Sequence, residues 1–294
     1  MIVHLIDGTY ELFRHFYGIR RFKKTDPPYG AVSGVLSTVV QLIDEGATHV
    51  GVATDHIIES FRNTMWAGYK TGAGIERALH AQFEPLEEAL TAMGVAVWAM
   101  VELEADDALA SAAHLAAQDS RVEKICIWTP DKDLAQCVVD DRVVQVDRRS
   151  GVIRDAEGVR AKFGVAPEFI PDYLALVGDA ADGYPGISGC GPKTAAQLIN
   201  RHGPLEKFPA TALNDQNRTL ALLFKDLATL RTDAPLFKNV DELEWHGTTP
   251  EFEAVAETIG NASLLKRVRK LEKKSGPQRS TKDTKRPTGK AVLS

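Results

Sequence analysis

KICIWTPDKDL, residues 124–134, is a short run of apolar residues that ends in threonine, proline and aspartate. Such a run predicts a buried strand that stops before the acid. Three other runs have the same form: IVHLID at 2–7, HVGVATD at 49–55 and RVVQVD at 142–147. Helical patterns lie between them at 31–45, 76–93 and 104–118. The alternation predicts an α/β fold, with a mainly parallel sheet and helices on both faces.

Acidic residues gather where these strands should end. In open α/β sheets ligands bind at this edge, and the strand ends supply Asp7, Asp55, Asp131 and Asp133. ELEADDALA, residues 102–110, adds Glu104, Asp106 and Asp107 at a helix start. A single acid of this kind is usually a turn residue, and acids also stabilise a first helical turn. So many unpaired carboxylates would repel one another, which predicts a cation site, and an oxygen-only ligand set favours Mg²⁺ or Mn²⁺ over zinc.

A second, helical region is predicted over residues 151–262, where short apolar stretches alternate with Gly/Pro turns. GDAAD at 178–182 adds Asp179 and Asp182. The glycines of PGISGCGPKTAAQLI, residues 185–199, permit close backbone approach, and free amides at the start of the following helix suit a phosphate. An ordinary glycine turn is the alternative, but the preceding acids favour a phosphate site.

Charge is unevenly distributed along the 294 residues, which have an ordinary globular composition and enough length for two domains. Residues 266–290 hold eleven Lys or Arg and two acids, whereas the whole chain carries −5. A basic, disordered tail is predicted over 263–294; it favours an anionic partner such as nucleic acid, although a merely solvated terminus would look the same. Apolar runs stay well short of the ~20 residues that span a bilayer, and the N-terminus lacks a signal-peptide pattern, so a cytoplasmic protein without membrane association is expected.

Five stretches of the sequence resemble the 5′-nuclease family, which comprises flap endonucleases and the 5′–3′ exonuclease domain of bacterial DNA polymerase I. They are LEADDALA, TPDKDL, LVGDAADGYPGISGCGPKTA, LIDG and SFRNTMWAGYK. The resemblance covers roughly residues 1–210. It implies a PIN-like nuclease domain over 1–150 with an arch segment at about 62–85, and a helix–hairpin–helix at 180–200 within the second region. No polymerase or proofreading portion follows, so a free-standing bacterial nuclease acting at the nucleoid is expected.

The resemblance also implies a reaction and residue roles. It implies two-metal hydrolysis of DNA phosphodiesters with Mg²⁺, or Mn²⁺ as a substitute, leaving 5′-phosphate and 3′-hydroxyl ends. Lys70 matches a catalytic lysine at the base of the arch, and Arg62 is expected to hold a phosphate. The implied first metal site comprises Asp7, Asp55, Glu104 and Asp106, and the second Asp131, Asp133, Asp179 and Asp182, with Asp106 between them and Asp107 as a ligand to metal-bound water.

The implied partner is branched or 5′-ended duplex DNA, with RNA primer–DNA hybrids as an open further target. In the family the hairpin turn holds duplex phosphates through backbone amides, commonly with K⁺, so recognition should depend on shape rather than sequence. A monomer is expected. The matching DNA-binding residues are Gly186, Gly189, Gly191, Lys193 and Thr194.

Two positions depart from the family pattern. Ala73 stands where relatives often have arginine, which predicts a weaker grip on flaps, and Gly183 stands where asparagine tends to occur, which predicts a looser backbone at the second metal site. Two other functions are weighed against a 5′ nuclease. A PIN-like ribonuclease needs neither the hairpin nor GDAAD, and a noncatalytic binder of branched DNA need not retain all nine acids.

Overall fold

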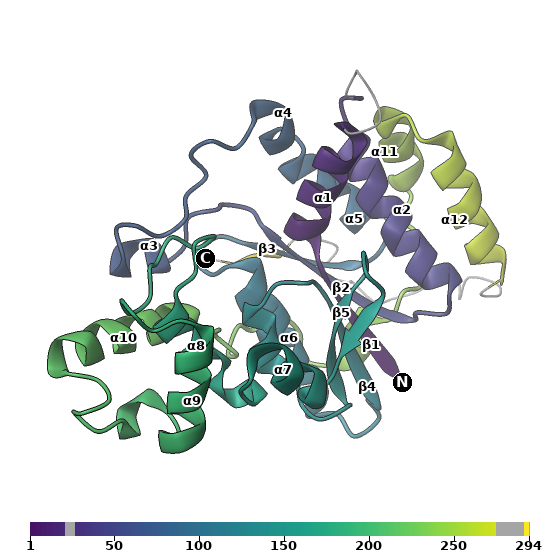
Figure 1. Ribbon diagram of the computed structural model, residues 1–294. Helices are drawn as coiled ribbons and strands as arrows, with labels where there is room; N and C mark the ends of the chain where they lie inside the picture. Colours follow the sequence, from purple (N-terminus) through teal and green to yellow (C-terminus); the bar gives the residue numbers. More distant parts are fainter. Residues whose placement is uncertain (21–26, 275–290, 294) are drawn as a thin grey trace.

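The computed structural model describes residues 1–20, 27–274 and 291–293, and its strands form one seven-stranded sheet in the order β6-β5-β4-β1-β2-β3-β7 (Figure 1). All neighbouring strands are parallel except β5 and β6. The predicted mainly parallel sheet is therefore confirmed. The strands are β1 (Ile2–Asp7), β2 (His49–Asp55), β3 (Ala96–Met100), β4 (Lys124–Trp128), β5 (Val143–Asp147), β6 (Val152–Arg154) and β7 (Ala291–Leu293).

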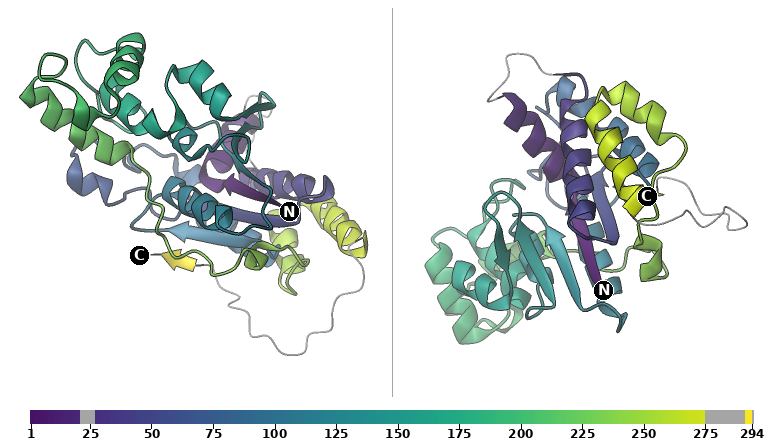
Figure 2. Two further views of the ribbon diagram at one scale, coloured as in Figure 1. Left: turned by 90° about the horizontal axis from the view of Figure 1, so that it is seen from below. Right: turned by 90° about the vertical axis from the view of Figure 1, so that its right-hand side faces the viewer.

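Alternating side chains bury both faces of this sheet. Ile6 and Val52 belong to the hydrophobic core on one face, whereas Leu5 and Ala53 belong to the core on the other. Figure 2 shows helices covering the two faces. The first core is closed by α1 (Gly8–Arg20), α2 (Gly30–Asp44), α5 (Phe83–Ala92), α11 (Phe252–Ile259) and α12 (Ala262–Lys274), and the second by α6 (Ala105–Ala117).

The helical region after β6 surrounds a core of its own, drawn in green in Figure 1. In it, α8 packs against both α9 and α10. At the end of α8, Gly178 adopts φ +86°, and a Cβ there would lie 2.4 Å from the Pro185 carbonyl carbon. This close turn returns Asp179 and Asp182 toward the sheet edge. The helices are α7 (Ala156–Phe163), α8 (Ile170–Val177), α9 (Pro192–His202) and α10 (Asp215–Ala228); short 3-10 turns are η1 (Asp133–Cys137), η2 (Pro167–Phe169), η3 (Leu205–Lys207) and η4 (Val240–Leu243).

Some predicted boundaries are wrong. Residues 263–274 of the expected disordered tail lie in α12, where Leu264 and Val268 are buried, and β7 pairs with β3. Residues 275–290 and 294 of that tail lie outside the described residues. The expected helix at 76–93 is divided into α4 (Arg77–His80) and α5. Among the helices described, none is long and apolar enough to cross a membrane.

The arch segment predicted at 62–85 is packed at both ends. It begins with α3 (Arg62–Met65), and Arg62 and Tyr69 are buried there. At its other end Leu79 and Phe83 enter the core beneath α5. The exposed part is therefore a short turn around residues 71–78, apart from half-buried Gly72 and Ile75.

Candidate active site

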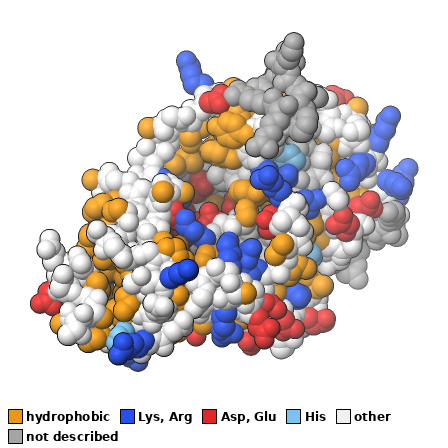
Figure 3. Space-filling model, viewed as in Figure 1, with side chains coloured by type: hydrophobic (Ala, Val, Ile, Leu, Met, Phe, Trp, Pro, Cys, Tyr) orange, Lys and Arg blue, Asp and Glu red, His pale blue; other side chains and the backbone are white. Residues whose placement is uncertain are grey.

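Acidic side chains from separate segments meet at the carboxyl edge of the sheet. Asp7 ends β1, Asp55 ends β2, and Asp131 and Asp133 follow β4. Asp106 lies in the first turn of α6. Figure 3 shows acidic side chains at the floor of a hollow on this face, with Lys and Arg side chains at its rim. Parallel strands bring their ends to one edge, so distant acids become neighbours.

Three of these carboxylates, together with Asp179 and Asp182 from the loop after α8, form two overlapping triads, Asp106–Asp131–Asp133 and Asp133–Asp179–Asp182. Within each triad one oxygen per residue lies within 4.8 Å of the others. Asp133, rather than Asp106, is therefore the shared member. Oδ1 of Asp133 and the hydroxyl of Tyr184 are buried and lack a hydrogen-bond partner among the described residues. A buried oxygen without a donor is costly, and a divalent cation would satisfy the Asp133 oxygen.

Asp7 and Asp55 lie beside the first triad. Asp7 accepts hydrogen bonds from the Tyr10 amide at 2.8 Å and the Thr129 hydroxyl at 3.0 Å, and Asp55 accepts one from the Ala105 amide at 2.8 Å. Burial raises the pKa of Asp7 to about 7, and repulsion from Asp55 and Asp131 adds to the rise. Burial also raises the pKa of Asp55 to about 6.

Three of the triad carboxyls, those of Asp106, Asp133 and Asp182, also have raised pKa values. Burial, followed by repulsion from Asp131, raises the pKa of both Asp106 and Asp133 well above its ordinary value. Burial likewise raises the pKa of Asp182, against the opposing effect of Lys70. Binding of a cation would favour the ionised forms of these groups.

Two lysines extend into this acidic cluster. Lys70 Nζ lies 2.7 Å from Glu104 Oε2 and 3.0 Å from Asp182 Oδ1, and Lys132 Nζ lies 2.6 Å from Asp179 Oδ2. Burial alone would raise the pKa of Glu104, but Lys70 and Arg62 outweigh it and lower that pKa. Lys70 thus joins Glu104, outside the triads, to the second triad.

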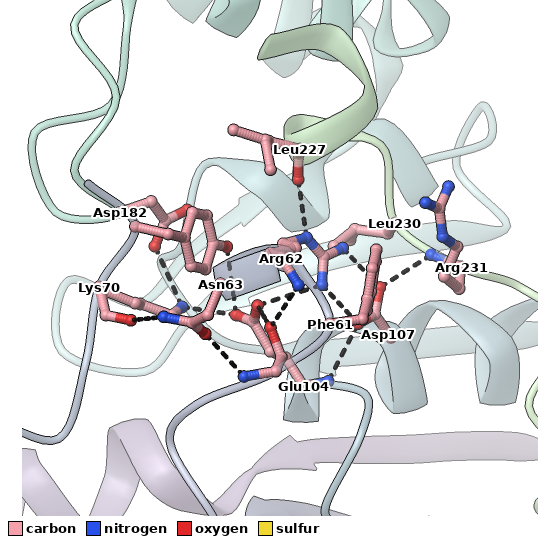
Figure 4. A network of polar contacts seen from close by, with 12 residues as sticks. Phe61, Arg62, Asn63, Lys70, Glu104, Asp107, Asp182, Leu227, Leu230 and Arg231 are labelled. Carbon is pink, nitrogen blue, oxygen red and sulfur yellow. Dashed lines mark hydrogen bonds and ion pairs between the residues drawn. The ribbon is translucent and has the colours of Figure 1, made fainter. Parts of the chain in front are cut away.

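Arg62 and Asp107 do not take the positions expected for them. The Arg62 side chain is 1% exposed, and its two terminal nitrogens each lie 2.7 Å from an Asp107 oxygen (Figure 4). Its Nε donates to the Leu227 carbonyl at 2.8 Å. The expectation that Arg62 holds a phosphate is therefore wrong, because the guanidinium is enclosed. The expectation that Asp107 binds metal-bound water is also wrong, because both of its carboxylate oxygens accept hydrogen bonds from other groups of the protein.

Gly183 marks a close approach between two chain segments. It adopts φ +83°, and a Cβ at this position would lie 1.9 Å from the Gly68 carbonyl oxygen. Trp66 Nε1 donates to the Gly183 carbonyl at 3.0 Å, and the Lys70 amide donates to the Asp182 carbonyl at 3.0 Å. The looser backbone expected from this glycine is therefore wrong, since the turn is fixed against the segment that carries Lys70.

The hairpin glycines differ in their surroundings. Gly186 is buried at φ +70°, and a Cβ there would lie 2.4 Å from the Gly178 nitrogen, so this residue forms the turn and is closed to DNA. Gly189 adopts φ +79° and is exposed, and a Cβ added there would meet no atom of the described residues within 4 Å. Gly191 caps α9, whose first turn carries exposed Lys193 and Thr194. The exposed amides here suit an anionic backbone.

Sequence reasoning missed three residues of the site. Lys132 stands between two ligand candidates in DKD, a signal that could have identified it. Trp66 has only the signal of a packing residue, and Tyr184 has none, because its position beside the acids depends on the turn at Gly178.

Family comparisons cover most of the chain. The family model described as 5′-3′ exonuclease, N-terminal resolvase-like domain, matches residues 2–164, and that described as 5′-3′ exonuclease, C-terminal SAM fold, matches residues 165–251. A 5′-3′ exonuclease of Aquifex aeolicus is 31% identical, over 82% of this chain and 86% of its own. DNA polymerase I of Pseudomonas aeruginosa is 34% identical over 81% of this chain, which spans 28% of that polymerase.

Solved structures share the same architecture. The zinc-bound 5′-exonuclease of phage T5 superposes with a TM-score of 0.61 at 17% identity, covering 93% of this chain and 99% of its own. The catalytic core of Rad2 in complex with a DNA substrate gives a TM-score of 0.59 at 13% identity, covering 91% and 90%. At these identities the likeness concerns the fold, which agrees with the sheet and helical region described above.

Proposed function

The chain belongs to the 5′-3′ exonuclease family, and on that premise we propose that it is a structure-specific 5′ nuclease that hydrolyses DNA phosphodiesters. The observation that carries the proposal is the pair of carboxylate triads sharing Asp133. Two adjoining oxygen-only sites are suited to a pair of Mg²⁺ ions, with Mn²⁺ as a substitute. The metal-bound phage T5 relatives support this choice of a divalent ion.

The two triads would each hold one ion, with Asp133 contributing to both. Such a pair of ions lowers the pKa of the attacking water and stabilises the attacking and leaving oxygens of an in-line displacement. Asp7, Asp55 and Glu104 would orient the ions through water, because Mg²⁺ keeps several water ligands. The products would carry 5′-phosphate and 3′-hydroxyl ends.

Lys70 supplies a fixed positive charge beside the reacting phosphate. Its ammonium group is held by Glu104 and Asp182, while the side chain stays 30% exposed. A cation preorganised where negative charge develops stabilises the transition state more than one that must reorganise. We therefore assign it a catalytic role.

The exposed part of the hairpin would hold the duplex. Gly189, Gly191, Lys193 and Thr194 present backbone amides and a cation around the start of α9, and a K⁺ ion bound there would add to the attraction for phosphates. Such contacts position DNA without reading its sequence, so cleavage should depend on junction shape and salt. Branched DNA is the proposed substrate of a monomeric enzyme, with RNA primer–DNA hybrids as a second substrate.

The test is cleavage of a 5′-labelled flap duplex with Mg²⁺ by the native protein, Asp133→Asn and Glu88→Gln. Glu88 is an exposed acid of α5 and serves as the control. We expect cutting near the junction, and a fall of ~100-fold or more only in Asp133→Asn, because loss of a shared ligand should exceed the 10–100-fold typical of outer-sphere changes. Flap affinity is measured separately with Ca²⁺.

The outcomes separate the alternatives. Native protein that binds branched DNA without cutting it would establish the noncatalytic binder. Cutting of single-stranded RNA in preference to the flap would establish the ribonuclease. Equal rates for the native protein and Asp133→Asn would contradict the two-metal mechanism.

A further inference from the structure

Arg62 lies at the centre of a buried ion-pair network, and neither Arg62 nor Asp107 belongs to the carboxylate triads (Figure 4). Its guanidinium forms a bidentate pair with Asp107, which is fully buried. Nη1 of Arg62 also lies 3.1 Å from Glu104 Oε1. Two parallel hydrogen bonds fix the plane of both groups, a geometry that lysine cannot reproduce.

Asp107 connects this pair to the backbone. Its Oδ2 accepts from the Glu104 amide at 3.0 Å, and its Oδ1 accepts from the Arg231 amide at 2.8 Å. The first of these bonds belongs to a capping box that begins α6. The position of the Glu104 backbone is thus set by the same carboxylate that holds Arg62.

The Glu104 side chain is divided between two groups of donors. Oε1 accepts from the Ser60 hydroxyl at 2.7 Å and from Arg62, whereas Oε2 lies 2.7 Å from Lys70 Nζ. Arg62 and Ser60 together therefore hold one oxygen of the carboxylate, and the other is directed at Lys70. A change in Arg62 would reach Lys70 through a single side chain.

The network also attaches the helical region. Arg62 donates to the carbonyls of Leu227 at 2.8 Å and Thr229 at 3.3 Å. The Phe61 ring lies between two guanidinium groups, with the central carbon of Arg62 at 4.6 Å and that of Arg231 at 4.8 Å. Arg62 therefore links three segments of the chain: its own, the start of α6 and the end of α10.

We infer that Arg62 is a positioning residue, which orients Glu104 and, through it, Lys70, without touching DNA. The inference rests on the proposed function for its catalytic consequence. A buried ion pair is often no more stabilising than apolar side chains of the same volume, so stability alone gives weak grounds for placing one here. A bidentate pair does provide a fixed orientation, and the group so oriented lies against the acidic site.

The experiment compares the native protein with Arg62→Lys and with the double variant Arg62→Met/Asp107→Leu, which removes both charges together and leaves no buried charge unpaired. Arg218→Lys is the control, because Arg218 also donates to backbone carbonyls, those of Leu205 and Phe208, but within the helical region. Melting temperature, flap affinity with Ca²⁺ and single-turnover cleavage at saturating DNA and Mg²⁺ are measured for each protein.

We expect both Arg62 variants to cleave ~10–100-fold more slowly with flap affinity changed less than ~2-fold, as for loss of a residue that orients a ligand. In a Lys70→Ala background the Arg62→Lys change should have little further effect on rate, because residues acting through one another are not additive. A native rate in a destabilised Arg62→Lys protein would reduce Arg62 to a structural role. If Arg62→Lys binds flaps more weakly but cleaves them at the native rate, the inference fails and Arg62 contacts a DNA phosphate instead.

A second measurement does not depend on cleavage. Amine-reactive labelling of Lys70, quantified by mass spectrometry, should be several-fold faster in Arg62→Lys than in the native protein, while labelling of exposed Lys193 stays the same. Equal labelling of Lys70 in both proteins would overturn the inference even if the native protein cuts DNA. Faster labelling in a protein that fails to cut would leave the positioning intact and refute the proposed function instead.

Discussion

Replacement of Gly183 by alanine should displace the segment that carries Lys70. The new Cβ would lie 1.9 Å from the Gly68 carbonyl oxygen, whereas real Cβ contacts essentially never fall under 3.0 Å. Because the opposing atom belongs to the backbone, the segments around Gly183 and Gly68 must move apart by about an ångström to reach 3.0 Å. This shift would stretch the hydrogen bonds from Trp66 to Gly183 and from the Lys70 amide to Asp182, both now 3.0 Å long.

The cost has two parts that a matched variant separates. An alanine in the left-handed region loses ~1 kcal/mol of the free energy of unfolding, relative to glycine, through strain alone. Two weakened hydrogen bonds add ~1–2 kcal/mol. Gly260 adopts φ +73°, and no atom of the described residues lies within 4 Å of the position that a Cβ would take, so Gly260→Ala carries the strain without the clash. Gly183→Ala should therefore be less stable than Gly260→Ala by ~1–2 kcal/mol.

Urea unfolding and single-turnover cleavage of a flap test this reasoning. A displacement of about 1 Å at a catalytic group can cost ~100-fold in rate, so Gly183→Ala should cut far more slowly than Gly260→Ala at saturating DNA and Mg²⁺. If the two variants are equally stable and both cut at the native rate, the contact at Gly183 does not hold Lys70, and the structural reason for this glycine fails.

Two further predictions concern the acids and the exposed turn. Because burial raises the pKa of Asp7 to about 7 and that of Asp55 to about 6, the folded protein binds protons that the unfolded chain releases above pH ~4. The free energy of unfolding should thus fall between pH ~4 and ~7 in EDTA, and added Mg²⁺ should raise the melting temperature more at pH 8 than at pH 5; a flat profile would contradict these pKa values. Ala73→Arg should raise kcat/KM for flaps, because Ala73 lies exposed in the turn, and unchanged kcat/KM and flap affinity would show that the missing arginine does not limit grip.

Strand ends were predictable because each buried run stops at an acid, and the mainly parallel sheet follows from their spacing. β3 was not predicted, although AVWAM is a short apolar run followed two residues later by Glu102, the same form as the runs that were predicted. The helix predicted over 76–93 is interrupted near Gln82, whose side-chain oxygen accepts the amides of Ala31 and Val32 at 3.1 and 3.3 Å. These hydrogen bonds from Gln82 cap the first turn of α2, whose own N-cap residue makes no side-chain capping bond. Gln82 and Val32 are 50 residues apart in the sequence. Local pattern carries no information about such a contact.

The site shows the same limit. The acids could be found from their positions after strands, but the partners of Arg62 could not, because Leu227 lies 165 residues away. In the sequence Arg62 is one basic residue near Lys70, and the expectation of a phosphate contact follows from that proximity. The expectation is wrong because the guanidinium of Arg62 is buried, and a carbonyl that helps to enclose it, that of Leu227, comes from the helical region. Gly183 was misjudged for a related reason, because the need for a glycine arises from Gly68 in another segment.

Charge distinguishes the two triads. In the second, Lys132 pairs with Asp179 and Lys70 with Asp182, whereas no described Lys or Arg lies within ion-pair distance of Asp106, Asp131 or Asp133. No neighbouring ammonium group offsets repulsion among the first three carboxylates, which agrees with the pKa values of Asp106 and Asp133 being raised well above the ordinary range by burial and by repulsion from Asp131. A divalent ion would displace protons at the first triad and compete with ammonium groups at the second. The pH dependence of metal binding should accordingly arise from Asp106 in the first triad, from Asp182 in the second and from the shared Asp133, because the pKa of each is raised. Arg62, by fixing Glu104, would influence the second triad through Lys70.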